Sequence, residues 1–154
     1  MNKEEVITRV RTERSRWNDI IAQINDDLML KPGVEGDWSA RDILAHVIWY
    51  EREIVGLLRA RAFVGSDLWA LPLDERNAGV HEETRSMTLE EVRAESERVF
   101  PDLLEQLEAL PEDAYGDPSS FPGMPAEWEP WYIIAGNTFN HYPDHIESLR
   151  QLLE

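Results

Sequence analysis

The spacing of apolar residues along this chain predicts helices rather than strands. Between Lys3 and Leu28, apolar residues recur at steps of three and four, which places them on one face of a helix. They are Val6, Val10, Trp17, Ile20, Ile21, Ile24 and Leu28. Asn2 is the expected N-cap, with Glu5 three residues later to complete a capping box. Residues 31–33 (Lys-Pro-Gly) end this first segment.

The second helix has the clearest start signal in the chain. Ser39 and Asp42 form a capping box, and Trp38 can pack onto Ile43 across the cap as a hydrophobic staple. The apolar stripe that follows fades near residues 63–65, and its members are Val47, Tyr50, Ile54 and Leu57 or Leu58.

The third and fourth helices follow the same rules. Thr88 and Glu91 predict the start of the third, which runs to Leu110 and contains Pro101, a residue expected to kink or locally break it. The fourth starts near Pro130, a favoured first position of a helix, and continues to the C-terminus. Its stripe is Ile134, Thr138, His141, His145, Leu149 and Leu152.

The connections between these helices differ in length. The first is short, the second spans residues 65–87, and the third, residues 111–127, is rich in proline and glycine. A connection as long as 65–87 can run the length of a bundle, so the second and third helices can be parallel neighbours. No strand pattern competes. The sequence therefore predicts an all-α helix bundle, with residues 1–154 forming one domain.

Charge and composition then narrow the classes of function. The chain has 15 Lys and Arg against 31 Asp and Glu, a net charge of −16 at pH 7, which argues against nucleic-acid binding and against adhesion to anionic lipid. It has no cysteine, which removes disulfides, thiolate nucleophiles and cysteine-ligated metals. No signal peptide or membrane-spanning stretch is visible, so we expect a cytoplasmic protein that acts on a small molecule.

Three of the four histidines occupy core-facing positions. His141 and His145 are four residues apart on the fourth helix, and His46 lies on the stripe of the second. Together they could form a set of three metal-binding imidazoles with one open coordination position, suited to zinc, nickel, iron or copper. The alternative is that they only form hydrogen bonds within the core. Pro143 is expected to kink the helix between the pair, which would either separate the two rings or aim them at one point. His81 lies in the long connection.

Other residues near these histidines suggest a pocket. Tyr50 and Tyr142 each adjoin a histidine and could donate a hydrogen bond to a substrate oxygen. Glu53 could be a general base, although a solvated carboxylate is the favoured interpretation. Asn137 is interpreted as a helix-packing amide or a substrate contact, and Gly136 as a site of close helix packing. Four tryptophans are candidate pocket walls: Trp49, Trp69, Trp128 and Trp131.

Two stretches of the chain resemble the DinB-like superfamily. Residues 36–47 (GDWSARDILAHV) are similar to its second helix, in which a tryptophan and an Asp-x-x-x-His element recur. Residues 131–149, with Gly-Asn-Thr at 136–138 and the His-x-x-x-His pair, are similar to its last helix. Residues 88–111 and the Asn-Thr-Phe-x-His-Tyr run resemble the ClbS/DfsB branch most.

This resemblance implies a four-helix bundle with a long crossover between helices two and three, often as a homodimer. It also implies a metal site formed by His46, His141 and His145. Metal-binding members are associated with thiol-dependent transferase or isomerase chemistry, which implies a divalent metal (zinc or nickel) and a low-molecular-weight thiol cosubstrate such as bacillithiol, mycothiol or glutathione. Members resembling ClbS instead hydrolyse or bind reactive small molecules without needing the full metal set.

The leading hypothesis is therefore a metal-dependent enzyme that transfers a thiol to, or hydrolyses, an electrophilic small molecule. Tyr50 or Tyr142 would orient the substrate. The alternative is a metal-free protective protein whose tryptophan-lined pocket sequesters or hydrolyses a reactive metabolite. A third interpretation is an interaction module in which the three histidines only pack.

Overall fold

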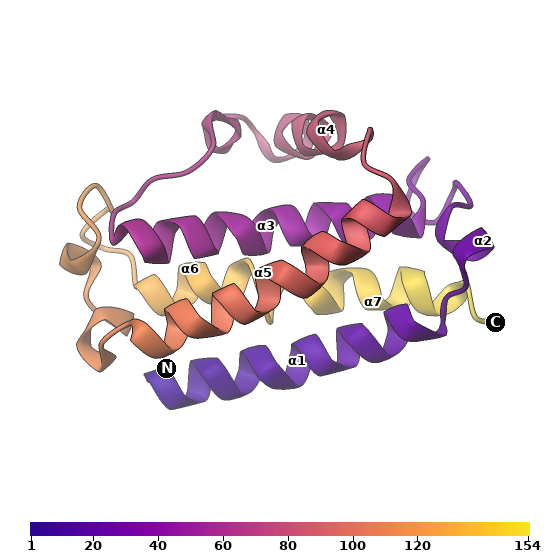
Figure 1. The fold of residues 1–154 in the computed structure, drawn as a ribbon. Coiled ribbons are helices and arrows are strands. Elements are labelled where there is room, and N and C mark those ends of the chain that lie inside the picture. The colour runs from indigo at the N-terminus through magenta and orange to yellow at the C-terminus, as the bar shows by residue number, and fades with distance from the viewer.

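Four helical rods lie side by side in the computed structural model, which describes all residues, 1–154 (Figure 1). The first rod is α1 (Lys3–Gln23), the second α3 (Ala40–Ala60) and the third α5 (Leu89–Ala109). The fourth consists of α6 (Pro130–Gly136) and α7 (Tyr142–Gln151). The predicted all-α class is confirmed. None of the helices combines the length and the apolar character needed to cross a lipid bilayer.

The rods run in two directions. α3 and α5 are parallel neighbours, and α1 and the α6–α7 rod run the opposite way (Figure 1). The return from the end of α3 to the start of α5 passes through η1 (Asp67–Ala70) and α4 (Leu73–Thr84), which packs on the outer side of α3. The predicted long crossover is thus confirmed, and it carries a helix of its own. The connection between α5 and α6 holds two short 3-10 helices, η2 (Glu112–Tyr115) and η3 (Pro118–Ser120).

The main core is a cluster of thirty buried apolar residues, most of them contributed by the four rods. Trp49, Tyr50 and Val80 form a second, small cluster between α3 and α4. The predicted stripes supply most of the main core, because each rod turns its apolar face inward. The predicted helix starts are also confirmed. Asn2, Ser39 and Thr88 each accept a hydrogen bond from the backbone N–H three residues later, and the side chain of that later residue accepts from the cap.

The first and third helices differ from their predicted courses. α1 ends at Gln23 instead of reaching Leu28, because the Asn25 side chain accepts from the Leu28 N–H at 2.9 Å and starts the short α2 (Asp26–Met29). Pro101, by contrast, lies inside an uninterrupted α5. Its ring is exposed, and so is Glu97, whose carbonyl loses its helical donor and can bond to water instead.

The fourth rod is broken at residues 137–141, so the helix predicted from Pro130 to the C-terminus is interrupted before His141 and not kinked between His141 and His145. Pro143 has no N–H to continue the helical ladder, and the Thr138 hydroxyl donates back to the Ile134 carbonyl at 2.7 Å. The Asn140 N–H reaches five residues back to the carbonyl of Ala135 at 2.9 Å, which widens the turn. This break places residue 141 on the turn before α7.

Candidate metal centre

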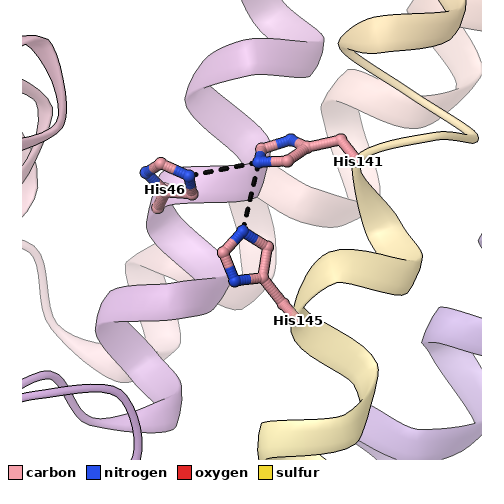
Figure 2. A group of neighbouring side chains, drawn as sticks. All are labelled: His46, His141 and His145. Atoms are coloured by element: carbon pink, nitrogen blue, oxygen red, sulfur yellow. Dashed lines mark hydrogen bonds between the residues drawn. The ribbon is translucent and has the colours of Figure 1, made fainter. Parts of the chain in front are cut away.

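The three predicted histidines converge between α3 and the start of α7 (Figure 2). Nε2 of His141 lies 3.2 Å from Nε2 of His46 and 3.1 Å from Nε2 of His145. His46 comes from the middle of α3, and the other two flank Pro143 at the start of α7. The helix breaks before His141 and not between the pair, so the two rings stay one helical turn apart and meet at one point instead of being separated.

These nitrogen atoms fit a metal ion better than they fit hydrogen bonds to one another. A ring nitrogen carries either one proton or one lone pair in its plane, so Nε2 of His141 cannot form good hydrogen bonds to both neighbours at once. Metal–nitrogen bonds of about 2.0–2.1 Å at tetrahedral angles require nitrogen atoms about 3.3 Å apart. The observed distances of 3.1 and 3.2 Å are close to this requirement. The donor set fits a divalent ion such as zinc or nickel.

Burial keeps two of the rings neutral. Desolvation lowers the pKa of His46 to about 4, with the charge of His145 acting in the same direction and that of Glu35 opposing it. Desolvation also lowers the pKa of His141 to about 2, assisted by the other two rings. Both rings are therefore uncharged at neutral pH, as metal ligation requires.

Glu35 orients the third ring. Its two carboxylate oxygens lie 2.9 and 3.0 Å from Nδ1 of His145, so Nδ1 donates to Glu35 and Nε2 faces the other two histidines. Burial raises the pKa of Glu35, but its hydrogen bond to His145 and the charge of that ring outweigh the burial and leave the pKa lowered. A tight turn holds Glu35, with Gly36 at φ +57° and the Trp38 N–H bonded to the Glu35 carbonyl at 2.9 Å. Nothing in the sequence distinguishes this carboxylate among 31 acidic residues.

Tyr50 lies beside the histidines, as the sequence suggested. Its ring centroid is 4.9 Å from that of His46 and 4.8 Å from that of His141. Its hydroxyl donates to Oδ1 of Asn77 at 2.8 Å. Burial raises the pKa of Tyr50 although the Arg76 cation opposes this shift, so the hydroxyl is a protonated donor at neutral pH.

Tyr142 is not brought to this site. The side chain is fully buried, and its hydroxyl donates to Oε2 of Glu51 at 3.1 Å. Glu51 is in turn paired with Arg14 at 3.2 Å. Successive residues of a helix point about 100° apart, so the residue that follows a ligand faces a different side of the rod. The proposed contact between Tyr142 and a substrate is therefore not supported by its position.

The histidines open onto a pocket of about 320 Å³. α4 covers one side of it with Leu73, Arg76 and Asn77, and the fourth rod supplies Gly136 and Asp144. The other lining residues are Trp69, Asn137, Tyr50 and the three histidines. Sequence reasoning missed Arg76 and Asn77, because the sequence does not show which residues of the long connection face the histidines. It also missed Asp144, which lies on α7 beside His145.

The tryptophans divide into two groups. Trp69 and Trp128 line cavities, as expected of pocket walls. Trp49 is buried and its Nε1 donates to Oε2 of Glu83 at 2.9 Å, whereas Trp131 packs against the main core. The predicted role as a pocket wall holds for the first pair only.

Two further interpretations need correction, and that of Asn137 agrees with the structure. Glu53 is neither a base beside the histidines nor a freely solvated group, because its Oε1 accepts from the Ser66 N–H at 2.6 Å and from Nε1 of Trp69 at 2.7 Å. Gly136 is not at a close helix contact, since an added Cβ there would meet nothing within 4 Å. Asn137 closes α6 by donating to the carbonyl of Ile133 at 2.8 Å, and its side chain also lines the pocket.

His81 lies in α4, within the long connection. Its ring stacks on that of Trp38, with centroids 5.4 Å apart, and its Nε2 is 3.5 Å from a carboxylate oxygen of Asp42. Trp38 also lies 5.3 Å from the His46 ring. His81 therefore holds α4 against the start of α3 and is not one of the three converging histidines.

Comparison with known proteins agrees with this architecture. The profile of the DinB superfamily matches residues 3–149. A structural-genomics protein from Streptococcus pneumoniae has the same fold, with a TM-score of 0.82 at 17% identity over 98% of this chain and 90% of its own. The colibactin self-resistance protein ClbS, solved with a double-stranded DNA, gives 0.81 at 18% identity over 99% and 96%. DfsB, described as a sibling lethal factor precursor, gives 0.79 at 14% identity over 98% and 94%. No curated protein sequence matches this chain significantly.

Proposed function

Because the chain belongs to the DinB superfamily, we propose that it is a metal-dependent enzyme that acts on an electrophilic small molecule. It either transfers a low-molecular-weight thiol to that molecule or hydrolyses it. The observation that carries the proposal is the approach of the His46 and His145 Nε2 atoms to within 3.2 and 3.1 Å of Nε2 of His141, beside a pocket. These three residues hold the ion.

The reaction class follows from what the chain has and what it lacks. A divalent ion supplies a Lewis acid that polarises a carbonyl and lowers the pKa of a water or a thiol. The chain has no cysteine, so any thiol in the reaction comes from a cosubstrate. The pocket of about 320 Å³ has room for a small substrate next to the histidines.

The chain's own residues supply orientation and proton transfer. Glu35 holds the proton on Nδ1 of His145, which keeps the Nε2 lone pair directed at the metal position. The Tyr50 hydroxyl donates to a substrate oxygen when it exchanges its present acceptor, Asn77. Asp144 is the only carboxylate among the residues that line the pocket, and it is the candidate proton acceptor.

We propose a small molecule rather than nucleic acid as the ligand. The DNA in the ClbS structure is bound by that protein. In this chain, 31 acidic residues against 15 basic ones repel a phosphate backbone, and DNA affinity depends on basic contacts to phosphate.

Elemental analysis of protein purified without a histidine tag tests the metal centre. About one zinc, nickel or iron per chain is expected, because three imidazoles form one site. The metal should be lost in His141→Ala and retained in His81→Ala, a matched control that removes a histidine outside the site. No metal in the wild type, before or after reconstitution, overturns the proposal. The metal-loaded protein is then assayed for thiol transfer and hydrolysis, and sedimentation of the same samples tests the expected homodimer.

A further inference from the structure

A larger cavity adjoins the pocket of the three histidines. It measures about 570 Å³, and eight of its thirteen lining residues are hydrophobic. It shares Trp69, Arg76 and Asn137 with the histidine pocket, so the two form one binding region with these residues at the junction. Its apolar walls include Ile54, Leu57, Phe63, Val64, Trp128 and Ile133.

Arg76 is an unpaired cation at this junction. Its guanidinium lies 4.7 Å from the ring centroid of Trp69, and Nη2 donates to the Leu71 carbonyl at 3.3 Å. Its Nε is buried and has no hydrogen-bond partner. Although the chain has 31 acidic residues, none lies within 4.0 Å of this guanidinium. The guanidinium also lies close enough to the Tyr50 hydroxyl to oppose the rise in the pKa of that group. A buried donor without a partner is unusual in a folded protein, and on a charged guanidinium it favours an anionic acceptor.

The remaining charge around the cavity does not neutralise this arginine. Glu53 is the only carboxylate in the lining, and its Oε1 is already engaged by the Ser66 N–H and by Nε1 of Trp69. Asp144 lines the histidine pocket but not the larger cavity. The larger cavity therefore combines apolar walls with one free cation, placed where it meets the histidines.

We propose that the larger cavity binds the apolar body of a small organic acid. The carboxylate of the acid pairs with Arg76, and its reactive end extends toward the histidines. The volume suits an aromatic ring with a short chain, since pockets of roughly 300–1,000 Å³ hold small ligands. Burial of that body against Trp69 and Trp128 supplies the apolar part of the affinity. This inference rests on the proposed function for the reaction at the histidines, but the binding itself needs no metal.

The test compares 4-phenylbutanoate with its neutral amide on chelator-treated protein, using tryptophan fluorescence. The acid should bind roughly tenfold more tightly than the amide, because its bond to the guanidinium is charge-assisted. Arg76→Gln should lower the affinity for the acid to that for the amide, and it should leave the affinity for the amide unchanged. Arg85→Gln is the matched control: this residue ends α4, is exposed, and pairs with Glu82 at 3.0 Å. It should keep the full preference for the acid.

A second variant locates the site without disturbing the core. Val64 lies on the rim of the cavity and is 54% exposed, so Val64→Asp should fold normally and weaken both ligands several-fold. The inference is overturned if neither ligand binds, if acid and amide bind equally, or if Arg76→Gln keeps the preference. It is also overturned if the preference exists only in metal-loaded protein, because the acid then binds the metal. If the protein holds no metal as purified or after reconstitution but still prefers the acid, this inference stands and the proposed function is overturned.

Discussion

Replacing Glu35 by glutamine keeps the size of the side chain and removes its charge. In the structure both carboxylate oxygens lie within 3.0 Å of Nδ1 of His145, so the ring donates its proton to a full negative charge. Glutamine can still accept this hydrogen bond through its amide oxygen, but without the charge. The imidazole of His145 then becomes a weaker electron donor at Nε2, and the metal is held less tightly.

The expected magnitude follows from the exposure of the pair. Loss of such a partner typically costs about 10–100-fold in metal affinity, which corresponds to about 1.4–2.7 kcal/mol. The Glu35 side chain is 25% exposed and that of His145 is 13% exposed, so solvent screens part of their interaction. We therefore expect the lower end of the range, about a tenfold loss of zinc affinity.

Competition with a chromophoric chelator at pH 7.5 measures this loss. Glu147→Gln is the matched control, because Glu147 lies on α7 with His145, pairs only with Arg150 at 3.0 Å, and its replacement changes the net charge by the same amount. Circular dichroism checks that both variants keep the helix content of the wild type. If Glu35→Gln binds zinc within twofold of Glu147→Gln, the argument that Glu35 supports the metal ligand is refuted.

Two further predictions concern stability. Glu51→Ala leaves the buried Arg14 guanidinium without its partner, so we expect a loss of about 3–5 kcal/mol in the free energy of unfolding. Urea denaturation measures this free energy, and a loss below about 1 kcal/mol would contradict the prediction. In metal-free protein the pKa of His46 is about 4, below its value of about 6.5 in the unfolded chain. As the pH decreases, the unfolded state therefore takes up the proton first, and the free energy of unfolding falls. Between pH 7 and pH 4.5 the wild type should lose about 2–3 kcal/mol relative to His46→Asn, and parallel pH profiles for the two proteins would exclude this effect.

The features that could be predicted from the sequence are local ones. A capping box involves residues within four positions of each other, so the starts at Ser39 and Thr88 were visible in the chain. Pro143 also indicated a disturbance of the last helix, but not that the break would precede His141 and leave the pair on one turn. The bond from the Asn140 N–H to the Ala135 carbonyl lies within this break, and no pattern of apolar residues reveals it.

The residues of the site that the sequence did not predict lie mostly in the connections between the rods. Glu35 lies in the short turn before α3, and Arg76 lies on α4 within the long crossover. Their positions over the histidines depend on how these segments pack on the rods, which is a property of the tertiary structure. The predicted substrate contact of Tyr142 was wrong because it relied on sequence proximity alone. Tyr142 is next to His141 in sequence, but the geometry of a helix turns neighbouring side chains apart.

The buried group around Arg14 also restricts how a ligand can enter. This side chain from α1 binds Glu51 on α3 and Ser96 on α5, and Glu51 accepts from Tyr142 on α7, so one polar network joins all four rods. Sliding any rod by one turn, about 5.4 Å, would break this network inside the core. If the proposed function holds, motions that admit a substrate should fall on α4, which buries only Val80 and Thr84 among its own residues. The four rods would then fix the position of the histidines, and the crossover would control access to them.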